Sequence, residues 1–299
     1  MGKEMKREVR LADATALELL YRELTHGLNE RSGLNITQYR ILQKIDELDN
    51  HARVKDISSD LKMRSNVVSM SANSMEKSKL VKRVRDGKDD RATYISMTPL
   101  GKRTLKGVNE DITKHFDSLW SDLPKDTAER AQATMVAIGK VLTDGHHENQ
   151  DGFMGSDYIT TIVEIHDSIG EIVKGTANIT YTAWRVLRFL HDNGGQSRMG
   201  IVSSGLFLQP STLTWIAGEL SEAGMVKREA DENTPNGILL SITPKGQEIL
   251  DTVQKNIDAT VVMRIWGHLS DDQYIASQEG SDGLVKAFAA KREVEENSE

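Results

Sequence analysis

Cysteine is missing from this chain of 299 residues. Its absence excludes a disulfide framework, a thiolate zinc site and a cysteine redox switch, and it fits a reducing cytoplasm. Long hydrophobic runs are missing too, since no apolar stretch approaches the roughly 18 to 20 residues that cross a bilayer. We therefore expect a soluble cytoplasmic protein that is not exported.

Aromatic residues make up only 5% of the chain, and strand-like alternation is scarce. Apolar residues instead recur every three or four positions over long stretches, which predicts a mainly helical fold. The length suits two domains of ordinary size. The formal charge of -7 is unevenly divided, because residues 1–150 hold 26 Lys and Arg against 23 Asp and Glu, whereas residues 151–299 hold 12 against 22. The first half therefore has a net positive charge, and its electrostatic field suits a nucleic acid.

Sequence motifs of the common enzyme classes are also missing: we find no P-loop, dinucleotide fingerprint, nucleophile elbow or His-Glu-x-x-His zinc helix. Among the eight histidines, only His146 and His147 are close in sequence. Adjacent histidines in a polar, glycine-containing segment make a poor preformed metal site. We expect no enzyme activity, no cofactor and no bound metal.

What the chain does have is an internal repeat. Adding 145 to a position in the first half gives its counterpart in the second, without a gap from about residue 34 to 105. Val81-Lys82-Arg83 thus falls on Val226-Lys227-Arg228, and Thr98-Pro99-x-Gly101 falls on Thr243-Pro244-x-Gly246. Identical residues at one fixed offset predict the duplication of a whole domain. The predicted boundaries are 1–143 for the first copy, 144–156 for a linker, 157–290 for the second copy and 291–299 for an acidic tail.

Each copy is expected to hold a helix-turn-helix followed by a β-hairpin, or wing. In the first copy, a short helix over 54–61 and a second helix over 64–77 are separated by a brief turn at Lys62-Met63. Asp86-Gly87 marks a turn between two extended runs. Thr98-Pro99 then opens a long helix, because proline is well tolerated at an early helical position.

The chain resembles the MarR family of transcriptional regulators. The residues that carry the resemblance are Leu34-x-x-x-Gln38-Tyr39-Arg40-Ile41-Leu42, Lys79-Leu80-Val81-x-Arg83, Asp89-x-Arg91 and Ile95-Ser96-Met97-Thr98-Pro99-x-Gly101, with a similar pattern in the second copy. The resemblance implies a mainly α fold with small β wings, in which long terminal helices join two winged helix-turn-helix domains into an intramolecular pseudo-dimer. It also implies a regulator that binds specific double-stranded DNA, acting as a repressor released by a small effector such as an aromatic or phenolic molecule.

Contact with DNA is expected mainly from the first copy, where residues 53–106 hold 14 Lys and Arg against 6 Asp and Glu. If Val68, Ala72 and Met75 are buried, the opposite side of their helix faces outward. The predicted DNA-binding residues are Arg64, Ser65, Asn66, Ser69, Asn73 and Lys77 on that helix, and Arg85, Lys88 and Arg91 in the wing. The alternatives are a merely solvated helix and a wing whose cations pair with its own aspartates.

In the second copy the candidate contact residues are Gln209, Ser211, Thr212 and Thr214. Its residues 198–251 hold 4 Lys and Arg against 7 Asp and Glu, and Asn236 stands where the first copy has Arg91. Trp215 is predicted to point outward, which suits a contact, or to join the core if the helix is rotated by one residue. The acidic second copy keeps open the alternative that the duplicated module acts mainly through protein contact.

The resemblance further implies a small-molecule cleft between the long helices and each winged module. Tyr21, His26, Tyr39 and Arg40 would then lie near one cleft, and His166, Trp184 and Arg185 near the other. Tyr39 and Trp184 equally suit core packing, because both occupy an apolar position of a helix.

Overall fold

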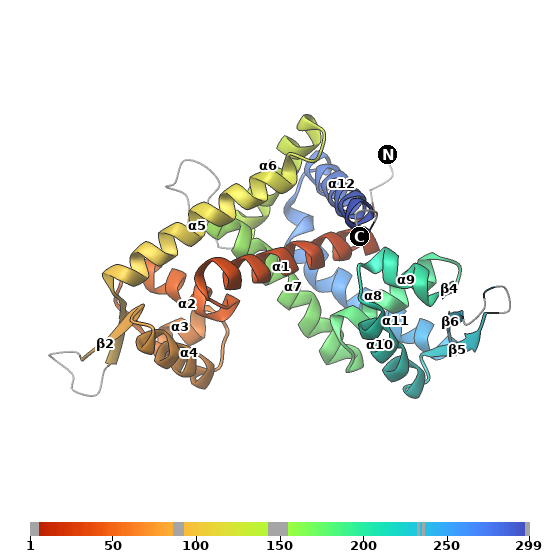
Figure 1. Ribbon diagram of the computed structural model, residues 1–299, viewed down its shortest axis with the longest axis horizontal. Coiled ribbons are helices and arrows are strands. Elements are labelled where there is room, and N and C mark those ends of the chain that lie inside the picture. Colours follow the sequence, from red (N-terminus) through yellow and green to blue (C-terminus); the bar gives the residue numbers. More distant parts are fainter. Residues whose placement is uncertain (1–5, 86–92, 143–154, 232–233, 235–236, 297–299) are drawn as a thin grey trace. The chain divides into compact units, whose positions relative to one another are not determined.

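The computed structural model describes residues 6–85, 93–142, 155–231, 234 and 237–296. The chain divides into two compact units. Unit 1 comprises residues 1–20, 120–149 and 160–299, and unit 2 comprises residues 21–119 and 150–159. Most described residues are helical (Figure 1). In the described part of the chain, no helix combines the length and the apolar character needed to span a membrane.

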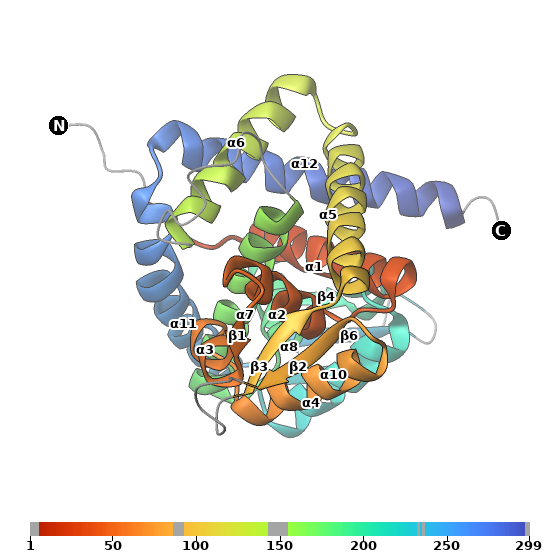
Figure 2. The ribbon, with the colours of Figure 1, turned by 90° about the vertical axis from the view of Figure 1, so that its left-hand side faces the viewer.

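Unit 2 contains the first winged helix-turn-helix. Its elements are the later part of α1 (Leu11–Ser32), then α2 (Ile36–Glu47), β1 (Ala52–Arg53), α3 (Val54–Asp60), α4 (Ser65–Lys77), β2 (Val81–Arg85), β3 (Thr93–Met97) and most of α5 (Pro99–Trp120). The strands form an antiparallel sheet in the order β1-β3-β2, with Arg83 opposite Ile95. Figure 2 shows β2 and β3 beside α4. The predicted order of helix, helix-turn-helix, wing and long helix is confirmed.

Local sequence accounts for the geometry of the helix-turn-helix. Asn35 and Gln38 form a capping box at the start of α2. Between α3 and α4, Lys62 adopts a left-handed backbone conformation with φ of 52°, which makes the tight turn. On α4, Val68, Ala72 and Met75 are buried as predicted. The opposite side of α4 is consequently the side that faces solvent.

The Thr-Pro-x-Gly motif joins the wing to the long helix. The Thr98 hydroxyl donates to the Lys79 carbonyl at 2.6 Å and accepts from the Gly101 backbone N–H at 3.1 Å. A Cβ atom at Gly101 would lie 2.1 Å from the Leu80 carbonyl oxygen, so only glycine allows the helix to start this close to the preceding strand. Thr243 and Gly246 make the same arrangement against Met225.

Unit 1 contains the second winged helix-turn-helix. Its elements are the first part of α1, then α6 (Lys125–Leu142), most of α7 (Gly155–Ala177), α8 (Tyr181–Asp192), β4 (Gln196–Arg198), α9 (Met199–Leu206), α10 (Pro210–Glu222), β5 (Val226–Ala230), β6 (Ile238–Ile242), α11 (Pro244–Ile257), η1 (Asp258–Val262), η2 (Trp266–His268) and α12 (Asp271–Glu296). The sheet order is β4-β6-β5. The element order repeats that of unit 2, and α10 begins at Pro210, 145 residues after α4 begins at Ser65.

The core of unit 1 draws on both halves of the chain. Val9 and Ala14 belong to the same hydrophobic cluster as Trp184 and Leu206. The Tyr181 hydroxyl donates to the Ala14 carbonyl at 2.9 Å. Helix α6 packs extensively along α12. The compact units therefore differ from the sequence ranges 1–143 and 157–290.

Two predicted segments differ in part from what the structure describes. Residues 291–299 were set apart as an acidic tail, yet α12 continues to Glu296, and Lys291 forms an ion pair with Asp122 at 2.6 Å. The helix thus extends into this segment and contacts the turn between α5 and α6 there. The predicted linker 144–156 lies mostly outside the described residues, and its last two residues already belong to α7.

Candidate nucleic-acid interface

The outward side of α4 carries the residues predicted to contact DNA. Arg64, Ser65, Asn66, Asn73 and Lys77 are exposed and Ser69 is half-buried. Arg64 is the N-cap and makes no side-chain hydrogen bond to the first turn, so backbone N–H groups at this helix start remain suited to an acceptor such as phosphate. The Ser58 hydroxyl donates to the Ser65 hydroxyl at 3.0 Å and links the two helices of the motif.

Apolar side chains lie among these polar ones. Met70 is 70% exposed and Val67 is 39% exposed. Apolar side chains on a recognition helix suit contact with thymine methyl groups. The periodicity that placed the polar residues outward also places these two outward.

One side chain of β2 is bound to α4. The Arg83 guanidinium forms an ion pair with Glu76 at 2.9 Å and also donates to the Asn73 side-chain carbonyl. Asn73 is therefore held by a protein partner, with its amide nitrogen left for an outside acceptor. The sequence does not predict this pairing, because it depends on how the strand returns along the helix.

The wing itself is described only in part. Arg85 is the last residue of β2, opposite Thr93. Lys88 and Arg91 lie outside the described residues, as does Asn236 in the second copy. Near the base of the wing, the Tyr94 ring stacks on His51 with ring centroids 3.6 Å apart, and the Arg53 guanidinium lies 4.8 Å from the Tyr94 ring centre. Sequence reasoning missed this cluster, since nothing in the spacing of its three residues indicates contact.

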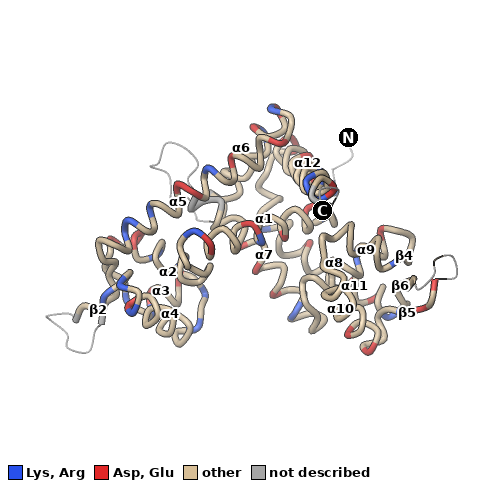
Figure 3. Tube along the Cα trace, in the orientation of Figure 1, with Lys and Arg blue, Asp and Glu red and all other residues tan. Residues whose placement is uncertain are grey.

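The charge around this module is positive. Lys and Arg recur around α3, α4 and β2 in Figure 3. No ion pair joins Lys62, Arg64 or Lys77 to a carboxylate within the described part of the chain. Their charge is consequently available to a polyanion.

The second module presents a different surface. Gln209 is the N-cap of α10, and its side chain and those of Ser211, Thr212 and Thr214 are exposed. Trp215, at the position equivalent to Met70, is 58% exposed, so the alternative that it joins the core is wrong. Arg198, one of the few cations here, is paired with Asp231 at 2.5 Å.

In unit 2, the residues predicted near a small-molecule cleft have protein partners. Tyr39 is fully buried, and its hydroxyl donates to the Asn109 side chain at 2.6 Å. His26 is exposed beside Glu30 at 3.4 Å. Tyr21 and Arg40 are partly buried. The structure therefore gives Tyr39 a packing role and does not gather the four residues around a described cavity.

In unit 1, Trp184 and Arg185 are fully buried, and Arg185 donates to the Leu206 carbonyl at the end of α9 at 3.1 Å. His166 lies 3.1 Å from Glu18 and 3.7 Å from Asp167. Burial, the largest single influence, lowers the pKa of His166, but hydrogen bonds to Asp167 and Glu18 together outweigh it and raise the pKa above its ordinary value. These residues connect α7 and α8 to α1 and to the helix-turn-helix.

Among the described residues, no three His, Asp or Glu side chains are grouped in a way that could hold a metal ion. His146 and His147 lie outside the described residues.

The first module is similar in sequence to transcriptional regulators. Residues 23–108 match the family model of the transcriptional regulator SarA/Rot. The HTH-type transcriptional regulator FarR of Neisseria gonorrhoeae is 32% identical over 86 residues, which are 29% of this chain and 58% of FarR. The matched region thus spans little more than half of that relative. YxaD of Bacillus subtilis strain 168, an uncharacterised HTH-type transcriptional regulator, is 29% identical over 116 residues, 38% of this chain and 80% of YxaD.

Among solved structures, the MarR family regulator Sco3205 of Streptomyces coelicolor, in complex with DNA, matches with 18% identity and a TM-score of 0.39, over 44% of this chain and 88% of Sco3205. Both sequence relatives carry the name of HTH-type transcriptional regulators. Residues 23–108 form a winged helix-turn-helix similar to that of SarA/Rot transcriptional regulators.

Proposed function

We propose that this protein is a transcriptional regulator that binds specific double-stranded DNA, chiefly through α4 and the first wing. The observation that carries the proposal is the outward side of α4, where Arg64 and Lys77 are exposed beside Asn66 on a module with a surplus of cations. Cations supply affinity for phosphate, and asparagine is suited to reading adenine. The match of residues 23–108 to a regulator family supports the same function.

We further propose that the chain is a fused pseudo-dimer that arose by duplication. Equivalent elements begin 145 residues apart, and α6 from one half packs along α12 from the other. One chain would then supply both recognition helices, α4 and α10, to one operator. We expect one chain per operator duplex, which sedimentation of the complex measures. We also expect the protein to act as a repressor in the cytoplasm.

Salt dependence tests the assignment to the first module. Each phosphate neutralised adds about 0.9 to the negative slope of log K against log salt. Replacing Arg64, Lys77 and Arg85 together with Ala should flatten the slope on a duplex by up to about 3. Replacing Lys227 and Arg228, both exposed in the second module, should flatten it less. Equal changes from the two variants would reverse the ranking of the modules.

A second candidate function has one observation in its favour. Trp215 is 58% exposed on a module in which acidic residues outnumber basic ones, and exposed tryptophan is enriched at protein interfaces. The second module would then bind a protein. Duplex binding that is weak and insensitive to salt in the unmodified protein would favour this function over the first.

A further inference from the structure

A cavity of about 80 Å³ lies inside unit 1, away from the recognition helices. It is enclosed mainly by helices from both halves of the chain, α1, α6, α7 and α12. Its walls are mostly apolar, with Leu17, Met135, Ile165 and Leu284 among the lining residues. None of the seven residues predicted to bind a small molecule lines it.

Two polar groups in the lining have no protein partner. Trp120 is 3% exposed and Thr161 is 1% exposed, and the Trp120 Nε1 and Thr161 Oγ1 atoms make no hydrogen bond within the described residues. A buried donor without a partner is costly, so native proteins rarely keep one without a reason. Thr134, which also lines the cavity, shows the contrast, since its hydroxyl donates to the Arg130 carbonyl at 2.9 Å.

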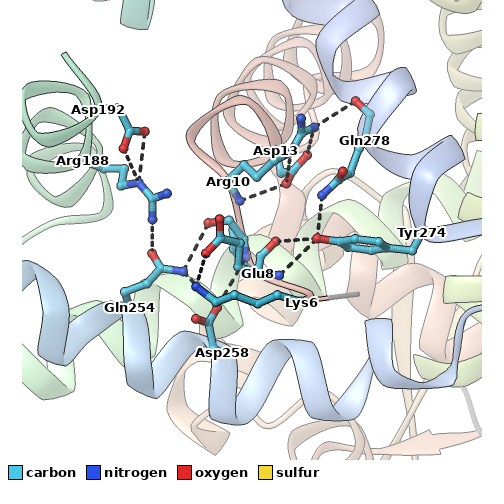
Figure 4. A network of polar contacts seen from close by, with 11 residues as sticks. Lys6, Glu8, Arg10, Asp13, Arg188, Asp192, Gln254, Asp258, Tyr274 and Gln278 are labelled. Carbon is cyan, nitrogen blue, oxygen red and sulfur yellow. Dashed lines mark hydrogen bonds and ion pairs between the residues drawn. The ribbon is translucent and has the colours of Figure 1, made fainter. Parts of the chain in front are cut away.

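The charged groups at the cavity are already satisfied. Asp13 lines it and binds Arg10 at 2.9 Å. Arg10 also donates to the Gln278 carbonyl at 3.0 Å and pairs with Asp282 at 3.2 Å (Figure 4 shows its bonds to Asp13 and Gln278). A buried carboxylate repels an anion, and its positive partner is already in place. A ligand for this cavity therefore has to be uncharged and has to accept a hydrogen bond.

We propose that this cavity is a binding site for a small uncharged molecule with a compact apolar body and an acceptor oxygen, such as acetone or another short-chain ketone. The apolar body fills the space between the four helices, and the oxygen accepts from the Trp120 indole N–H and the Thr161 hydroxyl. The volume limits the size, because an apolar cavity that holds benzene measures roughly 150 Å³, whereas this one measures about 80 Å³. A molecule as large as benzene exceeds the space available.

Helix α12 connects this cavity to the second helix-turn-helix. Ser277, Ser281 and Leu284 of α12 line the cavity. Further along the same helix, the Arg292 guanidinium donates to the Ser204 carbonyl at 3.1 Å and lies 5.2 Å from the Phe207 ring centre, at the turn between α9 and α10. A ligand that shifts α12 therefore acts on that turn. This regulatory consequence rests on the proposed DNA binding, whereas the binding site does not.

Tryptophan indole resonances of the full chain test the site. Trp120 and Trp266 line the cavity, whereas Trp184 is buried elsewhere and Trp215 is exposed. Titration with acetone should shift the Trp120 indole N–H signal saturably and leave Trp184 and Trp215 unmoved. Isobutene, which has the same shape with a methylene group in place of the oxygen, loses both hydrogen bonds and should bind about ten- to hundredfold more weakly. A Trp120 signal that does not saturate would mean that the cavity holds water only, and the proposal would fail.

Thr161→Val removes the hydroxyl at nearly constant shape, so the variant should fold. It should weaken the binding of acetone about three- to tenfold, the worth of one hydrogen bond, without changing the affinity for isobutene. Thr176→Val is the matched control on the same helix, because Thr176 accepts from Asn256 at 2.9 Å and does not line the cavity. Equal affinities of Thr161→Val and the unmodified protein for acetone would overturn the assignment of Thr161 as a donor to the ligand.

The same ligand added to the protein–duplex complex separates the two proposals. Loss of duplex affinity on addition of acetone supports regulation through α12. Saturable binding without any effect on duplex affinity would refute the regulatory consequence and leave the site standing. A protein that binds no duplex at all would refute the proposed function, while the Trp120 titration would still decide the site.

Discussion

At the scale of single residues, His166 on α7 joins two halves of the sequence within unit 1 through its contact with Glu18 on α1. The pKa of His166 is raised in the folded protein, because Asp167 and Glu18 outweigh the opposing effect of burial. The ring also lies 4.8 Å from that of Tyr181. A group whose folded pKa lies above its unfolded value stabilises most strongly below the unfolded pKa, which is about 6.5 for histidine.

We therefore expect the His166–Glu18 pair to stabilise the protein fully below about pH 6.5 and to lose this effect as pH rises through the folded pKa. Glu18→Gln should lower the unfolding free energy by on the order of 1 kcal/mol at pH 6 and much less at pH 8.5. Urea unfolding at both values measures the difference, and NMR titration of His166 should show a lower pKa in the variant. A loss of the same size at both values of pH would mean that the pair stabilises by packing alone.

At the scale of elements, the start of each long helix is positioned by a glycine that touches the preceding chain. A Cβ atom at Gly246 would lie 2.1 Å from the Met225 carbonyl oxygen, whereas one at Gly170 in α7 would meet nothing within 4 Å. Both glycines are helical, so alanine improves helix propensity at each by roughly 0.5 to 1 kcal/mol. Only the clash distinguishes them.

Gly246→Ala should therefore destabilise unit 1 by about 1 to 3 kcal/mol, since α11 must move away from Met225. Gly170→Ala, its matched control, should be neutral or stabilise by up to about 1 kcal/mol. Chemical unfolding followed by circular dichroism measures both. Equal effects would show that the close approach at Gly246 costs nothing to relieve.

At the scale of the whole molecule, unit 1 is assembled from segments at both ends of the chain. Residues 1–20 and 120–149 group with residues 160–299, and the ion pair of Arg130 with Glu279 at 2.9 Å joins α6 to α12. A cut between residues 143 and 154 would leave these contacts in place. We therefore expect the connection mainly to keep the two pieces at high effective concentration.

A protease site inserted between residues 143 and 154 tests whether the two pieces stay together without the connection. After cleavage, the two pieces should elute together in gel filtration at the mass of the intact chain, because they share the core of unit 1. A matched insertion within α6, after Ala131, should prevent stable association, because that residue is buried. Separate elution of the pieces after cleavage of the 143–154 segment would contradict the fused pseudo-dimer.

The sequence by itself determined the local parts of this protein. The apolar spacing of Val68, Ala72 and Met75 predicted which side of α4 is buried, and the Thr-Pro-x-Gly motif predicted where each long helix begins, because both depend on residues close together in the chain. The 145-residue offset likewise predicted the two winged modules. The tertiary structure alone decided that Trp120 and Thr161 line one cavity, that Arg83 holds Asn73, and that α6 lies along α12. Such contacts join residues on different elements, and periodicity within one element does not specify which other element packs against it.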